Sequence, residues 1–195
     1  MIAVMAVACL TANAQNSRHD AGSFTIQPMI GLSAGTLSGK YSSLTFNSDD
    51  PRWGITAGAE AEYYTSTHWL SVSAGLMYTQ QGWEGKGITN VTSKLDYFNI
   101  PILVNFYVTK GLALKIGLQP GFLLSAKAGS ENVKDSYESF NLSMPIGISY
   151  EFKNNITLDL RATPAMTAVN KNSNSDFKMR SDCVTLTVGY KFELK

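Results

Sequence analysis

The chain has 195 residues, a length that suits one domain. Its formal net charge of +1 provides no strong field for binding nucleic acid or an acidic partner. Charged residues make up only 16% and hydrophobic residues an ordinary 44%. No stretch approaches the ~20 consecutive apolar residues that a membrane-spanning helix needs. These values argue against a helical membrane protein and are typical of a barrel whose strands are half apolar.

The start of the chain predicts export. An apolar beginning is followed by Ala12-x-Ala14, a small-x-small cleavage signal. We therefore predict a cleaved signal peptide at residues 1–15 and a flexible lead-in at residues 16–22. A short buried helix and a lipid anchor on Cys9 are the alternatives for this segment. Export implies the periplasm, the outer membrane or the exterior.

Eight segments with a period of two follow, and this period predicts β-strands. In each segment, every second residue is mostly apolar and the residues between are mostly polar or small. The predicted strands are residues 23–35, 52–65, 69–79, 95–108, 112–124, 137–152, 156–163 and 183–193. Short turns at residues 66–68, 109–111 and 153–155 alternate with long polar loops at residues 36–51, 80–94, 125–136 and 169–182.

The central hairpin, residues 95–124, has the clearest pattern. Ile102 and Leu114 belong to its continuous apolar face, whereas Asn105 and Lys115 belong to a mixed, polar face. This predicts a hairpin of a closed barrel whose apolar face points to lipid. The predicted fold is all-β: an eight-stranded antiparallel up-and-down transmembrane β-barrel of outer-membrane type. The barrel would span residues 23–195. Its short turns would lie in the periplasm and its four long loops outside the cell.

Aromatic residues gather near the short turns and predict a girdle at the periplasmic boundary of the membrane. Tyr64 and Tyr107 flank the same turns. Taken singly, each is an ordinary strand aromatic, and only their grouping at strand ends favours a girdle. The predicted periplasmic girdle comprises Tyr63, Trp69, Phe106, Tyr150, Phe152, Tyr190 and Phe192.

Charged residues of both signs fall on the inward faces. An eight-stranded barrel is just wide enough to be filled by side chains, so a plug of paired charges is the first interpretation. A gated proton or ion path through the plug is the alternative. The predicted interior charge cluster comprises Glu60, Glu62, Lys115, Asp159, Arg161, Lys191 and Glu193. Inward positions of the outer half, such as Thr79 and Thr187, are small and uncharged, and we predict a wet vestibule there.

One segment resembles a known family. Residues 95–103 read L-x-Y-x-x-I-P-x-L, and this run resembles a strand of the PorT-like outer-membrane β-barrel proteins of Bacteroidetes, small barrels of the porin family. Gly117-x-x-Pro120-Gly121 and the closing residues 188–192 are similar to the same family. The resemblance implies an eight-stranded barrel in the outer membrane. It does not imply one activity, although the namesake of the family is linked to a protein-secretion system.

We expect no enzymatic activity, no cofactor and no metal ion. His19 lies in the lead-in and His68 in a short turn, and neither lies beside a Ser or Asp arrangement typical of a triad. The predicted function is an integral outer-membrane barrel, monomeric and surrounded by lipid. It would have a structural role in the envelope or contact an envelope or extracellular protein through its loops. A narrow pore, an accessory of protein secretion and a soluble lipocalin-like carrier are the alternatives.

Overall fold

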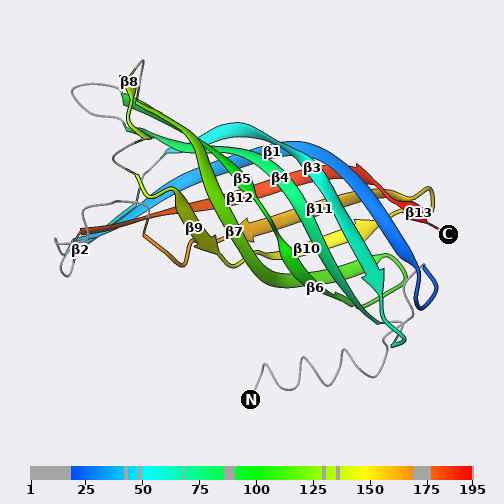
Figure 1. Cartoon of the computed structure of the whole chain (residues 1–195). Coiled ribbons are helices and arrows are strands. Elements are labelled where there is room, and N and C mark those ends of the chain that lie inside the picture. Colours follow the sequence, from blue (N-terminus) through cyan, green and yellow to red (C-terminus); the bar gives the residue numbers. More distant parts are fainter. Residues whose placement is uncertain are drawn as a thin grey trace.

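The computed structural model describes residues 19–41, 44–47, 50–67, 69–85, 91–128, 131–134, 137–168 and 177–194. Within these ranges the chain is a single antiparallel sheet (Figure 1). None of the described residues form a helix long and apolar enough to cross a membrane. The strands are β1 (Phe24–Tyr41), β2 (Leu44–Asn47), β3 (Asp50–Tyr64), β4 (Leu70–Gly85), β5 (Val91–Asn99), β6 (Ile102–Tyr107), β7 (Leu112–Ala128), β8 (Glu131–Asn132), β9 (Phe140–Ser143), β10 (Ile146–Glu151), β11 (Ile156–Thr163), β12 (Phe177–Tyr190) and β13 (Phe192–Leu194).

The sheet closes on itself because β10 pairs with both β11 and β7. Several positions of the wall are built from strands in line. β2 and β3 both pair with one edge of β1, and β12 and β13 with its other edge. β5 and β6 both lie between β4 and β7, and β9 and β10 both pair with β7. The breaks between β5 and β6 and between β9 and β10 occur at Pro101 and Pro145, and proline cannot donate to the ladder. Counted this way, the described strands form a ring of eight, and the predicted antiparallel barrel is confirmed.

The apolar faces of the strands point outward. Ile102 is 50% exposed, Leu114 37% and Leu158 41%, and all three belong to the alternating apolar positions. Their inward neighbours Leu103, Lys115 and Asp159 are buried. A lipocalin-like carrier would enclose its apolar face around a ligand, so that interpretation is wrong. An apolar band on the outside of a closed sheet is the arrangement that lipid requires.

The outer ends of the strands extend further than the sequence predicted. β1 continues to Tyr41, which pairs with Phe177 at the start of β12, and β4 pairs with β5 as far as Gly85 and Val91. The long loops predicted at residues 36–51, 80–94, 125–136 and 169–182 are therefore partly strand. In the sequence of these extensions, apolar residues no longer alternate with polar ones. Figure 1 shows these extensions on the left.

The opposite end carries the short turns. β6 and β7 are joined through residues 108–111, where Val108 N donates to Leu112 O over 2.8 Å. Asn155, in the turn after β10, has a φ of 63°, a left-handed conformation that asparagine tolerates better than most residues. β13 and the beginning of β1 lie at this end as well (Figure 1). The predicted signal peptide and His68 lie outside the described residues.

Candidate functional site in the barrel interior

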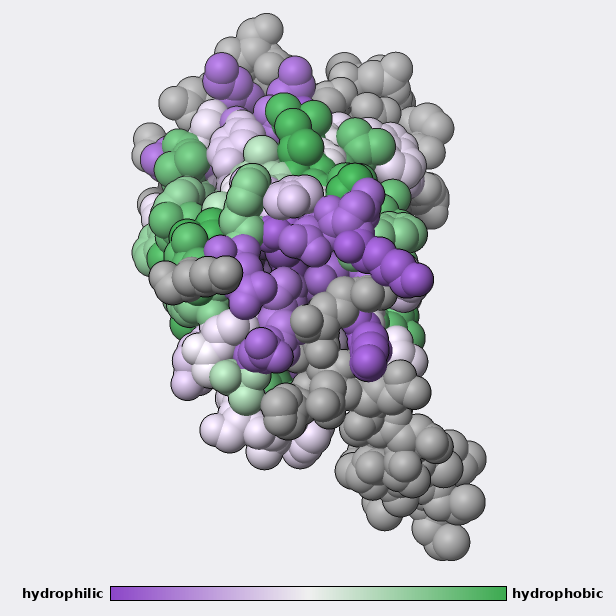
Figure 2. Space-filling model, turned by 90° about the vertical axis from the view of Figure 1, so that its right-hand side faces the viewer, coloured by the Kyte–Doolittle hydropathy of each residue, from purple (hydrophilic) through white to green (hydrophobic). Residues whose placement is uncertain are grey.

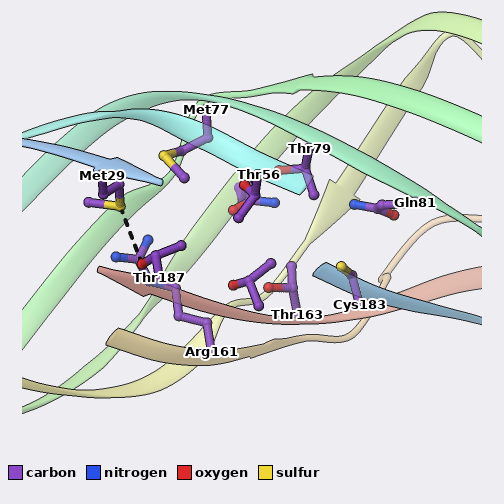
Figure 3. A pocket seen from close by; sticks show the side chains of 11 residues that line it. Met29, Thr56, Met77, Thr79, Gln81, Arg161, Thr163, Cys183 and Thr187 are labelled. Carbon is purple, nitrogen blue, oxygen red and sulfur yellow. Dashed lines mark hydrogen bonds between the residues drawn. The ribbon is translucent and has the colours of Figure 1, made fainter. Parts of the chain in front are cut away.

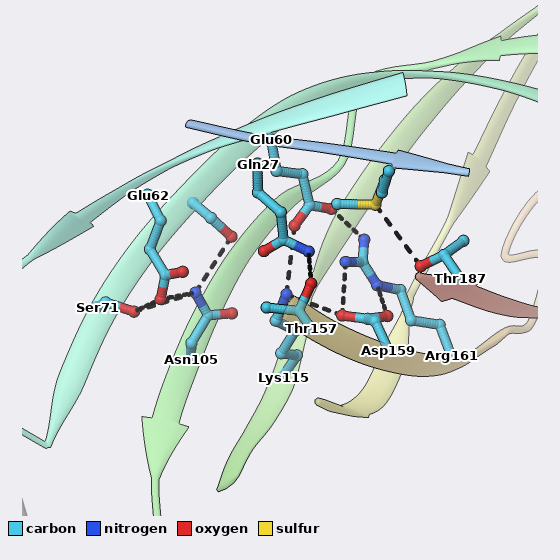
Figure 4. Close-up of polar contacts among 12 residues, drawn as sticks. Gln27, Glu60, Glu62, Ser71, Asn105, Lys115, Thr157, Asp159, Arg161 and Thr187 are labelled. Carbon is cyan, nitrogen blue, oxygen red and sulfur yellow. Dashed lines mark hydrogen bonds and ion pairs between the residues drawn. The ribbon is translucent and has the colours of Figure 1, made fainter. Parts of the chain in front are cut away.

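Four charged side chains form a layer in the middle of the interior, which we call the middle layer (Figure 4). Glu60 comes from β3, Lys115 from β7, and Asp159 and Arg161 from β11, and all four are buried. Lys115 Nζ lies 2.9 Å from Asp159 Oδ2 and 3.3 Å from Glu60 Oε2. Arg161 Nε donates to Asp159 Oδ1 over 2.6 Å, and its Nη1 donates to Glu60. The two cations and two carboxylates therefore neutralise one another.

A second set of charges, the periplasmic layer, lies nearer the short turns and consists of Glu62, Glu151 and Lys191. Lys191 Nζ lies 2.7 Å from Glu62 Oε2 and 3.2 Å from Glu151 Oε2. The same ammonium donates to the hydroxyls of Tyr64 and Tyr107 over 2.8 and 3.0 Å. Lys191 thus joins β3, β6 and β10 from the end of β12.

Neutral side chains complete the bonding of Glu62. Asn105 Nδ2 donates to Glu62 Oε1 over 3.0 Å, and Tyr107 donates to the same oxygen over 2.7 Å. Ser71 donates to it as well, and Asn105 also donates to Ser73 over 3.2 Å. A buried carboxylate needs such donors because burial removes its water. Figure 4 shows Ser71 and Asn105 pointing toward Glu62.

Six of the seven predicted interior charges lie inside the barrel, and Glu193 does not. Its side chain is 42% exposed because the last strand breaks at Lys191 and β13 ends at the rim. Glu151, at the end of β10, belongs to the periplasmic layer. It was not predicted from the sequence as an interior charge because it borders a turn. His19 was also missed, since the segment before β1 has no periodic pattern. Its Nε2 lies 3.1 Å from Glu151 Oε1, which accepts a hydrogen bond from the ring.

The sequence predicted a wet vestibule in the outer half, but the inward residues that the structure describes there, such as Thr79 and Thr187, are buried. The cavity beyond Arg161 has a volume of about 20 Å³, and Met29, Met77, Thr56 and Thr187 are among its lining residues (Figure 3). That volume is about the space of one water molecule. The inward positions are small, but methionine side chains from β1 and β4 fill the space between them.

An apolar cluster lies further out, on the inner face of β5 and β7. Leu95, Tyr97, Leu123 and Ala126 are buried there. Val133 and Tyr137, from the segment after β8, pack against them. This cluster explains the pattern L-x-Y at residues 95–97, since both side chains point into the barrel.

The seven predicted girdle residues are all exposed on the outer face near the short turns. Three pairs of them are in contact: Trp69 with Phe106, Tyr150 with Phe152, and Tyr190 with Phe192. Tyr64 and Tyr107 differ, because both point inward and are buried. Figure 2 looks onto the short-turn end, where hydrophilic residues gather at the centre of the view and hydrophobic residues lie around them.

Comparison with known proteins identifies the family. Residues 13–171 match the family model described as an outer membrane protein beta-barrel domain. The chain belongs to this family. Its location is accordingly the outer membrane, and lipid surrounds the exposed apolar band. No curated protein matches the sequence of this outer-membrane barrel.

Solved structures similar to this outer-membrane barrel have the same fold. Neisserial surface protein A superposes with a TM-score of 0.54 at 18% identity, covering 87% of this chain and 97% of that chain. Ail, the attachment invasion locus protein of Yersinia pestis, superposes with a TM-score of 0.51 at 18% identity, covering 88% of this chain and 99% of that chain. The Ail structure was determined in complex with the heparin analogue sucrose octasulfate. At this identity the likeness shows the fold alone.

Proposed function

We propose that this outer-membrane barrel is a non-enzymatic and non-conducting anchor. It holds its outer strand extensions and loops above the membrane, where they contact a partner in the envelope or outside the cell. The observation that carries the proposal is the buried, paired interior of the described residues. Two layers of paired charges lie across it, and the cavity beyond them has room for about one water molecule.

A narrow pore would require the charge layers to separate. Lys115 and Arg161 each contact two carboxylates, so an opening along the middle layer breaks several contacts together. Leaving one partner of a buried ion pair uncompensated costs about 3–5 kcal/mol. A spontaneous opening of that cost is rare at equilibrium, which favours an anchor over a pore.

Recordings in planar lipid bilayers test this function. The refolded wild-type protein should give no discrete conductance steps, after a gel has shown that the unheated protein migrates as a folded barrel. The double variant Lys115→Ala/Arg161→Ala removes both cations of the middle layer and serves as the comparison. Discrete steps from the wild-type protein would contradict the anchor and support the narrow pore.

An accessory function in protein secretion is the second candidate. It is supported by the PorT-like motif, whose residues Leu95, Tyr97, Pro101 and Leu103 are all buried on the inner face of β5 and β6 or between them. A strain that lacks the protein should then retain exported cargo in the periplasm. Normal export in that strain would leave the anchor as the better description.

Export through a cleaved signal peptide at residues 1–15 is part of this proposal, as is a monomeric barrel. The sequence pattern Ala12-x-Ala14 supports the cleavage site. Sequencing the amino terminus of the protein from outer membranes would test it. A mature chain that still contains Ala12 would contradict the predicted site.

A further inference from the structure

Residues 19–23, which we call the segment before β1, place one side chain in the periplasmic mouth of the barrel. His19 is only 6% exposed although it precedes the first strand. Its Nε2 lies 3.1 Å from Glu151 Oε1, and its Nδ1 lies 3.4 Å from Glu193 Oε2. Its ring also lies against Tyr64, with 4.9 Å between the ring centroids. Contacts to β3, β10 and β13 therefore converge on one imidazole.

Backbone hydrogen bonds attach the same segment to the end of β3. Gly22 N donates to Tyr64 O over 2.8 Å, and Tyr64 N donates to Ser23 O over 3.1 Å. Ser23 N donates to Asp20 O over 3.1 Å, which closes a turn between His19 and β1. The hydrogen bond of the Gly22 amide, which protects it from exchange with solvent, thus belongs to the same local structure as the His19 ring.

The charges around His19 favour a cation at its position. The periplasmic layer contains two carboxylates, Glu62 and Glu151, and one ammonium, that of Lys191. Protonated His19 adds a second positive charge beside these carboxylates, with Glu193 at the rim as a further carboxylate partner. Among the described residues, the hydroxyls of Tyr64 and Tyr107 are further titratable groups at this site, and both bond to Lys191.

We propose that protonated His19 is a latch that holds the segment before β1 over the periplasmic mouth, and that loss of its proton releases this segment. The imidazolium adds a positive charge beside Glu151 and bridges β10 to β13. Neutral His19 can donate from only one ring nitrogen, so one of its two carboxylate contacts loses its donor. The latch goes beyond the anchoring function and does not depend on it.

The direction of the pH dependence follows from the surroundings of His19. Burial disfavours the imidazolium, but the hydrogen bond and the charge of Glu151 outweigh burial and raise the pKa of His19 above its usual 6.5. A group whose pKa is raised by folding stabilises the folded arrangement fully below its unfolded pKa. That stabilisation disappears as the pH rises through the raised pKa. The latch should therefore be closed in acid and open above the titration of His19.

Hydrogen exchange of the Gly22 amide tests the latch in the full protein in lipid nanodiscs. The measured quantity is its protection factor, corrected for the intrinsic pH dependence of exchange, while NMR follows the titration of His19. Protection should fall across that titration by about tenfold for each unit by which the pKa of folded His19 exceeds 6.5. In His19→Gln the protection should be low at all pH values.

His68→Gln is the matched control, and its Gly22 amide should behave like that of the wild type. Glu151→Gln removes the principal carboxylate partner and should reduce the pH-dependent change. Constant Gly22 protection across the titration of His19 in the wild-type protein would overturn the proposal. So would a folded His19→Gln variant that keeps the wild-type protection and pH profile. The wild-type titration decides the question even if a variant fails to fold.

Discussion

Arg161 and Asp159 lie two residues apart on the inner face of β11, and Arg161 Nε donates to Asp159 Oδ1 over 2.6 Å. The same guanidinium donates to Glu60 on β3, across the interior of the barrel. One cation therefore joins a local partner to a distant one. Its removal would leave two buried carboxylates with Lys115 as their remaining cation.

Arg161→Ala should destabilise the barrel by about 3–5 kcal/mol, the usual loss when one partner of a buried ion pair is removed. Urea unfolding in lipid vesicles measures the change in the free energy of unfolding. Arg180→Ala is the matched control, because Arg180 is exposed at the outer end of β12 and should change stability by no more than ~0.5 kcal/mol. Equal losses in both variants would contradict a special contribution of Arg161.

Leu160→Arg should cost about 2–4 kcal/mol, because a charge on the lipid face near mid-depth is expensive. Leu160 is exposed on the outer face of β11 and pairs with Leu186 and Ile148. Ile156→Arg is the depth control on the same strand, since Ile156 adjoins the periplasmic turn and should cost ~0–1 kcal/mol. Unfolding in the same vesicles compares the two. A cost that does not depend on depth would argue against the assigned membrane position.

Thr187→Cys should not react with a bulky, membrane-impermeant maleimide added to intact cells. Thr187 is buried beside a cavity of about 20 Å³, and the reagent cannot enter it. Lys127→Cys, at the exposed outer end of β7, is the positive control. The parent protein is the blank, because its Cys183 is buried. Rapid labelling at position 187 would support the wet vestibule that the sequence predicted.

The membrane-embedded part of the fold was readable from the sequence because lipid and interior impose opposite demands on alternate residues. Ile102 and Leu103 illustrate the limit of that contrast, since both are apolar and only their position in the period assigns one to lipid and the other to the interior. The strand ends beyond the membrane were missed. The sequence at residues 36–41 does not alternate apolar with polar residues, although Thr36 and Lys40 both pair with β12.

The interior site was readable only where its members lie on long strands. Glu60 and Arg161 follow the inward alternation, and the structure places them in contact. His19 precedes any pattern, and its contact with Glu151 joins residues 132 positions apart. Glu193 has the right parity but lies past the break at Lys191. The alternation of residues along a strand assigns each side chain to the inner or the outer face, but it does not show at which residue the barrel interior ends.

The pairing of β1 with β12 continues from Ala34 and Val184 to Tyr41 and Phe177. At about 3.3 Å per residue, this stretch is roughly 20 Å long. Hydrogen bonding along the whole stretch makes it a stiff stalk instead of a loose tether. A force applied to a molecule bound at its tip would therefore be transmitted directly to the barrel wall and to the bilayer around it.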